Sequence, residues 1–291
     1  MFSIIGIVVV LGAIVGGYLM ERGNLLVLLQ PAELIIIGGA AIGTLLIANP
    51  LPTVIGVFKG ILGVFTPSKY DKNLYLMTLA MLNDLFNKGR KGGIATLESD
   101  VEQPDQSELF KKYPKIMAQH HAIELICDTL RIVMAANISP FELDQMLELD
   151  LEVHHKEISQ AASALVTVAD ALPGLGIVAA VLGVVITMGS LGGPPAEIGH
   201  KVAAALVGTF LGILLCYGFF SPCAANMAKA NDYETQYYNC LRSGLLCYIR
   251  GAAPLVAVEF ARRSIPHAMR PSFQELEGEL RGKPAEQPVA A

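Results

Sequence analysis

The sequence predicts an all-α polytopic membrane protein with four transmembrane helices and a helical cytoplasmic domain. Of its 291 residues, 53% are hydrophobic and only 16% are charged, against roughly 25% charged residues in an average soluble protein. The mean hydropathy is +0.50. Four runs contain no Asp, Glu, Lys or Arg, and each is long enough to cross a hydrocarbon core, which takes about 20 helical residues.

These runs set the expected order of elements along the chain. We expect transmembrane helices at residues 1–20, 34–50, 171–190 and 201–222. Two short outer connectors and two larger parts on the other side account for the rest, at 21–33, 191–200, 51–170 and 223–291. The alternative for the first run is a cleaved signal peptide, but it has neither a basic start nor an A-x-A cleavage site.

The basic residues predict the orientation. Of the 21 Lys and Arg residues, 19 lie within 51–170 and 223–291. Basic residues accumulate on the cytoplasmic side of membrane proteins, so both termini and the large loop are expected in the cytoplasm and the connectors in the periplasm. Five cysteines without a CxxC pair agree with a reducing compartment and indicate neither a disulfide framework nor a structural zinc site.

Charge also limits the function. A net charge of −5 leaves no positive excess for nucleic acid. No nucleophile–base pair, phosphate loop or pair of catalytic carboxylates is visible, so we expect no enzyme, no cofactor and no metal. The pairs His120–His121 and His154–His155 are expected to be surface residues, because adjacent histidines point in different directions on a helix.

Small residues recur at four-residue spacing in all four runs, which allows close approach of helices. In the third and fourth runs the expected packing positions are Gly176, Ala180, Gly208 and Gly212. The simpler interpretation is that membrane helices are rich in glycine. The sequence Gly174-x-Gly176-x-x-Ala179 mimics a dinucleotide-binding fingerprint, but it follows no strand and is not interpreted as one.

Three polar or helix-bending positions stand out in the same two runs. Pro173 and Pro222 each free a backbone carbonyl and can bend a helix, although a helix terminus is the ordinary place for a proline. The hydroxyl of Thr209 can bond within its own helix, which the residue type favours, or face a pore. No ionisable residue lies in the interior of any run, so an ion path would need a carboxylate from another chain.

The cytoplasmic parts show helical periodicity at 74–88 and 122–136 and no two-residue alternation, so little or no sheet is expected. Ser139-Pro140-Phe141-Glu142 predicts a helix start with a capping box. The tail after Arg270 is expected to be disordered. A basic turn at 87–93 beside an acidic patch at 98–102 is either a solvated helix face, the simpler interpretation, or a docking surface for a charged partner.

Several motifs resemble those of the MotA family, the A subunits of the bacterial flagellar stator. Residues 205–214 followed by Pro222 are similar to the signature of its fourth helix. Further similarity is spread from residue 1 to about residue 280, at 30–34, 172–181, 257–262 and 270–273. The related TolQ and ExbB proteins have three spans, so four spans and a long loop favour the MotA type.

This resemblance implies partners and a location. It implies a motility protein of the bacterial inner membrane, in contact with membrane lipid, in which five copies of this chain surround two MotB subunits. MotB would supply the membrane aspartate and the peptidoglycan anchor, and the pair would form an ion channel, of the proton type by overall likeness. Ion flow would then drive flagellar rotation through the rotor protein FliG.

The resemblance also implies roles for individual residues. Pro173 and Pro222 match prolines that couple ion flow to conformational change, and Thr209 matches a threonine that faces the ion path. Tyr217 is a weaker ion-path candidate. Three positions match rotor-contact residues, namely Arg90, Glu98 and Asp150. Many family members carry Glu at the place of Asp150.

Three other functions remain open from the sequence. A TolQ/ExbB-type energiser of outer-membrane transport or integrity would also be driven by ion flow, but it would not rotate a flagellum. A substrate permease would require polar midplane groups and internal repeats, and neither is visible. A passive membrane scaffold would show no proton-dependent activity together with MotB.

Overall fold

The structure, a computed structural model, describes residues 2–136, 138–189 and 192–281. Every regular element in the described part is helical and none is a strand, which confirms the predicted all-α class. The described part contains four helical stretches that are long and apolar enough to cross a membrane: Phe2–Met20, Leu25–Ala48, Pro140–Met188 and Pro195–Ile249. The chain divides into two compact units, Met1–Pro67 with Glu157–Ala230 and Ser68–Lys156 with Asn231–Ala291.

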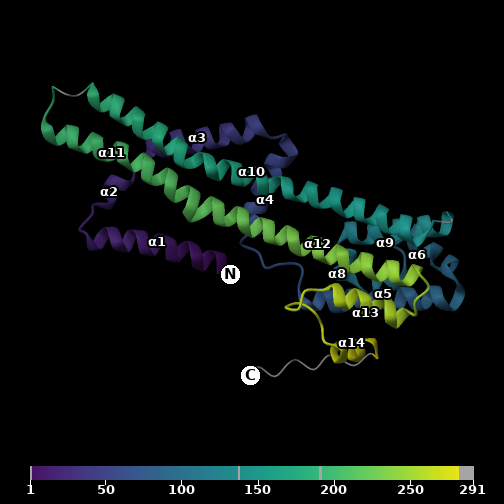
Figure 1. Cartoon of the computed structure of the whole chain (residues 1–291). Helices are drawn as coiled ribbons and strands as arrows, with labels where there is room; N and C mark the ends of the chain where they lie inside the picture. The colour runs from purple at the N-terminus through teal and green to yellow at the C-terminus, as the bar shows by residue number, and fades with distance from the viewer. Residues whose placement is uncertain (1, 137, 190–191, 282–291) are drawn as a thin grey trace. The chain divides into compact units, whose positions relative to one another are not determined.

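The first unit contains the apolar helices (Figure 1). Its elements are α1 (Phe2–Met20), α2 (Leu25–Leu28), α3 (Pro31–Ala48), α4 (Leu51–Gly63), the later part of α10 (Pro140–Met188), α11 (Pro195–Ile213), a π-helical segment η2 (Leu214–Phe220) and the start of α12 (Ser221–Ile249). α3 packs on α11, and α1 contacts η2. No residue of α1 is buried, as expected for an apolar helix whose surroundings are lipid or another chain.

Local sequence explains where these helices begin and end. α3 stops at Ala48 because Asn49 and Pro50 are extended, and the helix α4 begins directly after this proline. The predicted start of α10 is confirmed: Glu142 N–H donates to Ser139 Oγ, and the Glu142 carboxylate accepts from Ser139 N–H at 3.0 Å. The helix α2 lies within the expected outer connector 21–33. The domain boundaries themselves stay predictions.

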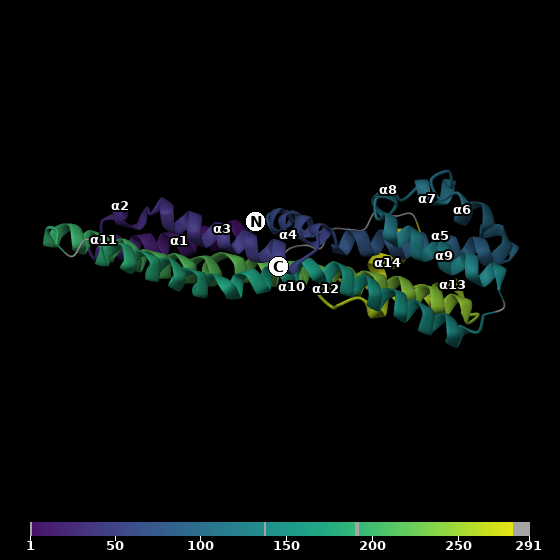
Figure 2. The same ribbon diagram turned by 90° about the horizontal axis from the view of Figure 1, so that it is seen from above.

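The second unit is a helical domain around one apolar core. It consists of α5 (Lys72–Gly92), a 3₁₀ turn η1 (Ile94–Leu97), α6 (Glu98–Glu102), α7 (Glu108–Lys111), α8 (Pro114–Met117), α9 (His120–Ala135), α13 (Pro254–Ser264), α14 (Phe273–Leu280) and parts of α10 and α12. Figure 2 shows α6, α7 and α8 as a short-helix region beside α5 and α9. α5 packs on α13 and α14, and its apolar face is fully buried at Leu79, Leu82 and Leu85.

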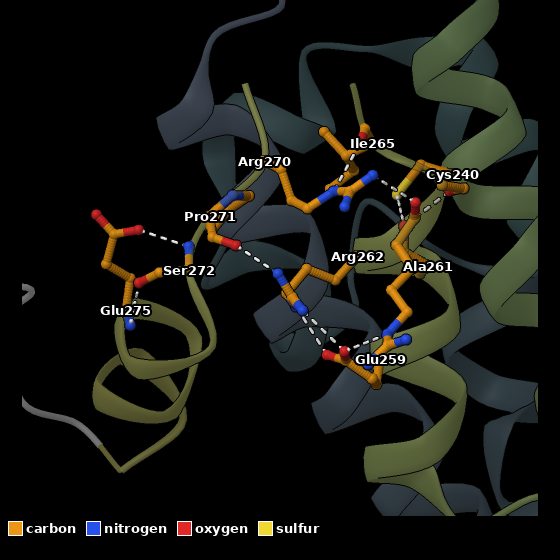
Figure 3. A network of polar contacts seen from close by, with 11 residues as sticks. Cys240, Glu259, Ala261, Arg262, Ile265, Arg270, Pro271, Ser272 and Glu275 are labelled. Carbon is orange, nitrogen blue, oxygen red and sulfur yellow. Dashed lines mark hydrogen bonds and ion pairs between the residues drawn. The ribbon is translucent and has the colours of Figure 1, made fainter. Parts of the chain in front are cut away.

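A polar clasp holds the end of the chain on this unit. The Arg262 guanidinium pairs with Glu259 at 2.7 Å and donates to Pro271 O at 2.8 Å, and Arg270 donates to Ile265 O (Figure 3). Hydrogen bonds from Arg262 lower the pKa of Glu259 to about 2. The clasp joins residues 257–262 to residues 270–273, the two tail motifs that carried the family resemblance.

The expectation of a disordered tail after Arg270 was therefore wrong for its first part. Ser272 and Glu275 form a capping box that starts α14, and Leu276 is buried in the core. The amphipathic pattern of these eight residues was too short to read against a polar, proline-containing end. The remaining tail, from residue 282 onward, lies outside the described residues.

Candidate functional site

The later part of α10 and α11 form a hairpin in which glycines bring the two backbones together. A Cβ atom placed on Gly212 would lie 2.5 Å from Leu172 O and 2.9 Å from Gly176 Cα. A Cβ atom on Gly176 would lie 2.8 Å from Gly208 O. These separations are shorter than van der Waals contact, so only glycine fits at both positions. The predicted packing residues thus come together in the structure.

The close contact continues along the hairpin through Ala179, Ala180 and Gly208. A Cβ atom on Gly208 would lie 3.1 Å from Ala179 Cβ and 3.3 Å from Ala180 N. The glycine pairs of the first two spans differ. A Cβ atom on Gly12 or Gly39 would meet nothing within 4 Å in this chain. Close packing of small residues therefore belongs to α10 and α11, and the spacing pattern alone did not distinguish them.

The two prolines occupy different structural positions. Pro173 lies inside α10, so the alternative that it marks a helix start is wrong. Pro222 is the second residue of α12, one residue after the end of the π-helical segment η2. A proline cannot donate to the carbonyl four residues before it, and here Ser221 N–H bonds to Cys216 O, five residues back. Single π-helical turns of this kind occur often at functional sites.

Thr209 and Tyr217 are the candidate ion-path residues on this helix. The described threonines Thr44, Thr78, Thr129, Thr167 and Thr187 all bond their hydroxyl to a backbone carbonyl of the same helix. Thr209 makes no such bond with any described residue, against the expectation from residue type. Its half-buried hydroxyl is thus free to meet an ion or water. Tyr217, within η2, is 69% exposed in this chain.

One carboxylate, that of Glu33, is buried among these helices. From the sequence, Glu33 is expected at the end of the outer connector 21–33, just before the second uncharged run. Glu33 lies in the first turn of α3, inside the apolar stretch Leu25–Ala48, and only 7% of its surface is exposed. Its Oε2 atom has no hydrogen-bond partner. The expected second span, 34–50, left Glu33 outside the helix, but α3 begins at Pro31, before the uncharged run does.

The charged residues Arg90 and Glu98 lie exposed at one end of the second unit. Arg90 is in the last turn of α5, and Glu98 is the first residue of α6. A left-handed Gly93, with φ of 83°, ends α5 and turns the chain toward η1. Neither side chain forms an ion pair within the described part of the chain, so both charges are available to a partner.

An ion pair between an exposed lysine and a buried carboxylate fixes this turn. Asp100, part of the acidic patch expected on the surface, is only 4% exposed. It pairs with Lys88 of α5 and accepts a hydrogen bond of 2.6 Å from Ser107. Sequence reasoning missed this positioning role. The twelve-residue separation of Lys88 and Asp100 carries no periodic signal, because an irregular turn joins them.

Asp150 lies on α10, in the second unit. It lines a cavity of about 340 Å³ between α9, α10 and α12, together with His121, Glu124, Asp128 and His154. Arg90 and Glu98 thus flank the same turn, whereas Asp150 lines this cavity.

Two of the four paired histidines are half-buried and bonded to a neighbouring helix. His154 bonds Glu234 at 3.0 Å, and His155 bonds Thr235 at 2.8 Å, both between α10 and α12. Burial of Glu234 alone would raise its pKa, but hydrogen bonds from His154 and Tyr70 outweigh this and lower the pKa. Within the described ranges, no group of three His, Cys, Asp or Glu side chains could hold a metal ion, and all five cysteines are free.

Comparison with known proteins places these features in one family. Residues 4–93 match the family model "Motility protein A N-terminal", and residues 116–239 match "MotA/TolQ/ExbB proton channel family". Motility protein A of Salmonella typhimurium is 43% identical over 97% of this chain and 95% of its own length. The Escherichia coli protein of that name is 42% identical over the same shares.

Solved structures share the fold. A structure of C. jejuni MotAB matches 93% of this chain and 98% of its own with a TM-score of 0.75 at 18% sequence identity. The flagellar MotAB stator complex from Bacillus subtilis matches 88% and 92% with a TM-score of 0.67 at 22% identity. Because the close sequence relatives are matched over nearly their full length, this chain belongs to the motility protein A (MotA) family.

Proposed function

We propose that this chain is the A subunit of a flagellar stator: with MotB it forms a proton channel and converts proton flow into torque on the rotor. The observation that carries the proposal is the composition of one helix. α11 is packed on α10 by glycines, carries the free hydroxyl of Thr209, and leads through the π-helical segment η2 into Pro222. The Thr209 hydroxyl, which can bind the ion, thus lies on the same continuous helix as η2 and Pro222, where that helix can change conformation.

The wider setting agrees with this function. The chain is a multi-pass inner-membrane protein with MotB as its partner in a multimeric assembly. Its close relatives are motility proteins rather than enzymes. The alternative, a TolQ/ExbB-type energiser, is less supported because residues 4–93 match the N-terminal model of motility protein A.

Several finer features belong to the same proposal. Five copies of the chain surround two MotB subunits, with both termini in the cytoplasm and the connectors in the periplasm. The excess of basic residues in 51–170 and 223–291 supports this orientation. MotB contributes a membrane aspartate and the peptidoglycan anchor, because the outer connectors are too short to fold as a domain.

The proposed mechanism has two steps. Moving one charge through 100 mV supplies about 2.3 kcal/mol. Protonation of the MotB aspartate removes its charge and changes its fit against α10 and α11. Pro173 and Pro222 let these helices shift, and the shift reaches the second unit, whose exposed Arg90 and Glu98 contact FliG.

The function is tested by deleting the gene and by purifying its product. We expect the deletion strain to build flagella that do not rotate, with outer-membrane integrity unchanged. We also expect the tagged chain to co-purify with a one-span protein that carries a membrane aspartate. Outer-membrane defects in a strain that swims normally would instead support the energiser.

A charge reversal tests the proposed rotor contact. We expect Arg90→Glu to lower torque severalfold without lowering membrane accumulation, because an exposed ion pair contributes at most about 1 kcal/mol to stability but can steer a reversible contact. Torque is measured from the rotation of tethered cells. An opposite reversal on FliG should restore part of the torque.

The matched control is Lys115→Glu, which also reverses an exposed charge, on α8, and should leave torque unchanged. Equal loss in both variants, or no rescue by any FliG reversal, would contradict an electrostatic contact at Arg90 and Glu98.

A further inference from the structure

Glu33 is the feature of the first unit that the proposed mechanism does not use. It lies on α3, in a notch between two glycines of the α10–α11 hairpin. A Cβ atom on Gly208 would lie 2.6 Å from Glu33 Oε2, and one on Gly183 would lie 3.6 Å from Glu33 Oε1. The absence of side chains at these two positions makes the space that the carboxyl group fills.

The notch offers this carboxyl group no partner. Oε2 is fully buried without a hydrogen bond, and no ion pair joins Glu33 to another described residue. Burying an ionised carboxylate without a partner is far more costly than burying the neutral acid. Ionisable residues inside membrane helices are, for the same reason, usually functional.

The charged and titratable groups on the neighbouring elements lie farther along their helices. α11 carries Glu197, His200 and Lys201, and Lys201 pairs with Glu197 at 3.0 Å. Lys201 is seven residues, or about 10 Å, from Gly208 along the helix. Of the other elements in this unit, α10 carries Glu157 and Asp170, α4 carries Lys59, and α2 carries none. The remaining titratable or charged groups are Tyr18 of α1, Glu21 and Arg22 between α1 and α2, Cys216 and Tyr217 of η2, and Cys223 and Lys229 of α12.

We propose that Glu33 is a proton-binding residue that this chain itself adds to the ion path. The carboxyl group holds a proton while it is seated in the Gly183–Gly208 notch, and it releases the proton when α3 moves off the hairpin. Since Gly208 is adjacent to Thr209, the released proton enters at the level of the ion-path hydroxyl. In the orientation proposed above, α3 begins at the periplasmic surface, so Glu33 loads protons from outside. This inference rests on the proposed stator function.

Proton flux through the stator complex tests it. The complex of this chain with its MotB partner is reconstituted in vesicles, and flux is followed with a proton-sensitive dye from mildly acidic to mildly alkaline pH on the outer side. Wild-type flux is measured first, because its absence would contradict the stator function rather than the role of Glu33. We expect Glu33→Gln to reduce flux about tenfold on the alkaline side, where protons are scarce, and less on the acidic side.

Glu33→Asp separates proton binding from packing. Gln has the shape of Glu without its proton chemistry, whereas Asp keeps the acid and loses a methylene group. Proton binding predicts that Asp retains more flux than Gln, and a packing role predicts the reverse order. Glu21→Gln is the matched control, since it neutralises an exposed carboxylate at the end of α1 and should leave flux unchanged.

Each result for Glu33→Gln and Glu33→Asp either supports or contradicts the inference. Higher flux for Asp than for Gln, with the deficit of Gln growing toward alkaline pH, supports the inference. Unchanged flux in Glu33→Gln overturns it. If Glu33→Gln does not assemble while Glu33→Asp assembles and conducts with a shifted pH dependence, the acid is again supported. If neither assembles, or if Gln conducts better than Asp, Glu33 only fills space and the inference fails.

Discussion

Replacing Gly212 by valine is expected to abolish motility by separating α10 from α11. Any Cβ atom at this position would lie 2.5 Å from Leu172 O and 2.9 Å from Gly176 Cα. Both neighbours are backbone atoms, which cannot rotate away as a side chain can. Overpacking of this kind typically costs about 1–3 kcal/mol, and the branched side chain adds two further methyl groups to the clash. We therefore expect both lower membrane accumulation and loss of swarming.

The matched control for this variant is Gly174→Val. Gly174 lies two residues from Gly176 on α10, but a Cβ atom there would meet nothing within 4 Å of this chain. Accumulation is measured by immunoblotting of membranes, and thermal unfolding is measured on the purified subunit. A Gly212→Val subunit with wild-type accumulation and unfolding temperature would contradict the close hairpin.

Replacing the two prolines should have an effect of a different kind: the stator assembles but does not rotate the motor. An alanine at position 173 restores an N–H group inside α10 that can bond the carbonyl of Ala169. An alanine at position 222 allows the π-helical segment η2 to revert to α-helix. Both changes restore a backbone N–H donor and leave the packing glycines in place, so we expect normal co-purification with MotB and no rotation of tethered cells.

Pro195→Ala is the control for the proline variants. Pro195 is the first residue of α11, where a proline costs no helical hydrogen bond and its replacement should be neutral. Wild-type rotation in both Pro173→Ala and Pro222→Ala would refute their coupling role. Loss of co-purification would show instead that they stabilise the assembly.

Much of the fold could be predicted from the sequence, because two strong signals dominate it. Four long uncharged runs indicated the membrane helices, and 3.6-residue periodicity indicated α5 and α9. The Ser139 capping box is equally local, since its partners are three residues apart. These features depend on residues close together in the chain, where spacing determines geometry.

Features that depend on tertiary packing could not be predicted in this way. Glu33 marks the edge of an uncharged run in the sequence, and only the packing of α3 on α11 shows that it is buried. The π-helical segment has the same composition as the α-helix around it. Lys88 and Asp100 are joined through an irregular turn, and His154 pairs with Glu234 from a distant part of the chain.

The family resemblance predicted one of the residues that the sequence pattern alone missed, Thr209, but not Glu33. It indicated Thr209 as an ion-path residue where residue type favoured an intrahelical bond, and the structure leaves that hydroxyl unbonded to any described residue. Nothing in the motifs indicated a role for Glu33, although it lies within the family-like segment 30–34.

The proposed mechanism requires that the MotB aspartate supplies the carboxylate that carries the proton across the membrane. Proton flux into vesicles under an imposed membrane potential tests this requirement directly. Three samples are compared: this chain alone, this chain with MotB, and this chain with MotB in which the membrane aspartate is replaced by asparagine. We expect flux only in the second sample, because the sole carboxylate buried in the described helices of the first unit lies in the first turn of α3 and cannot carry a proton across the membrane by itself. Flux through this chain alone, or undiminished flux with the asparagine variant, would contradict the mechanism.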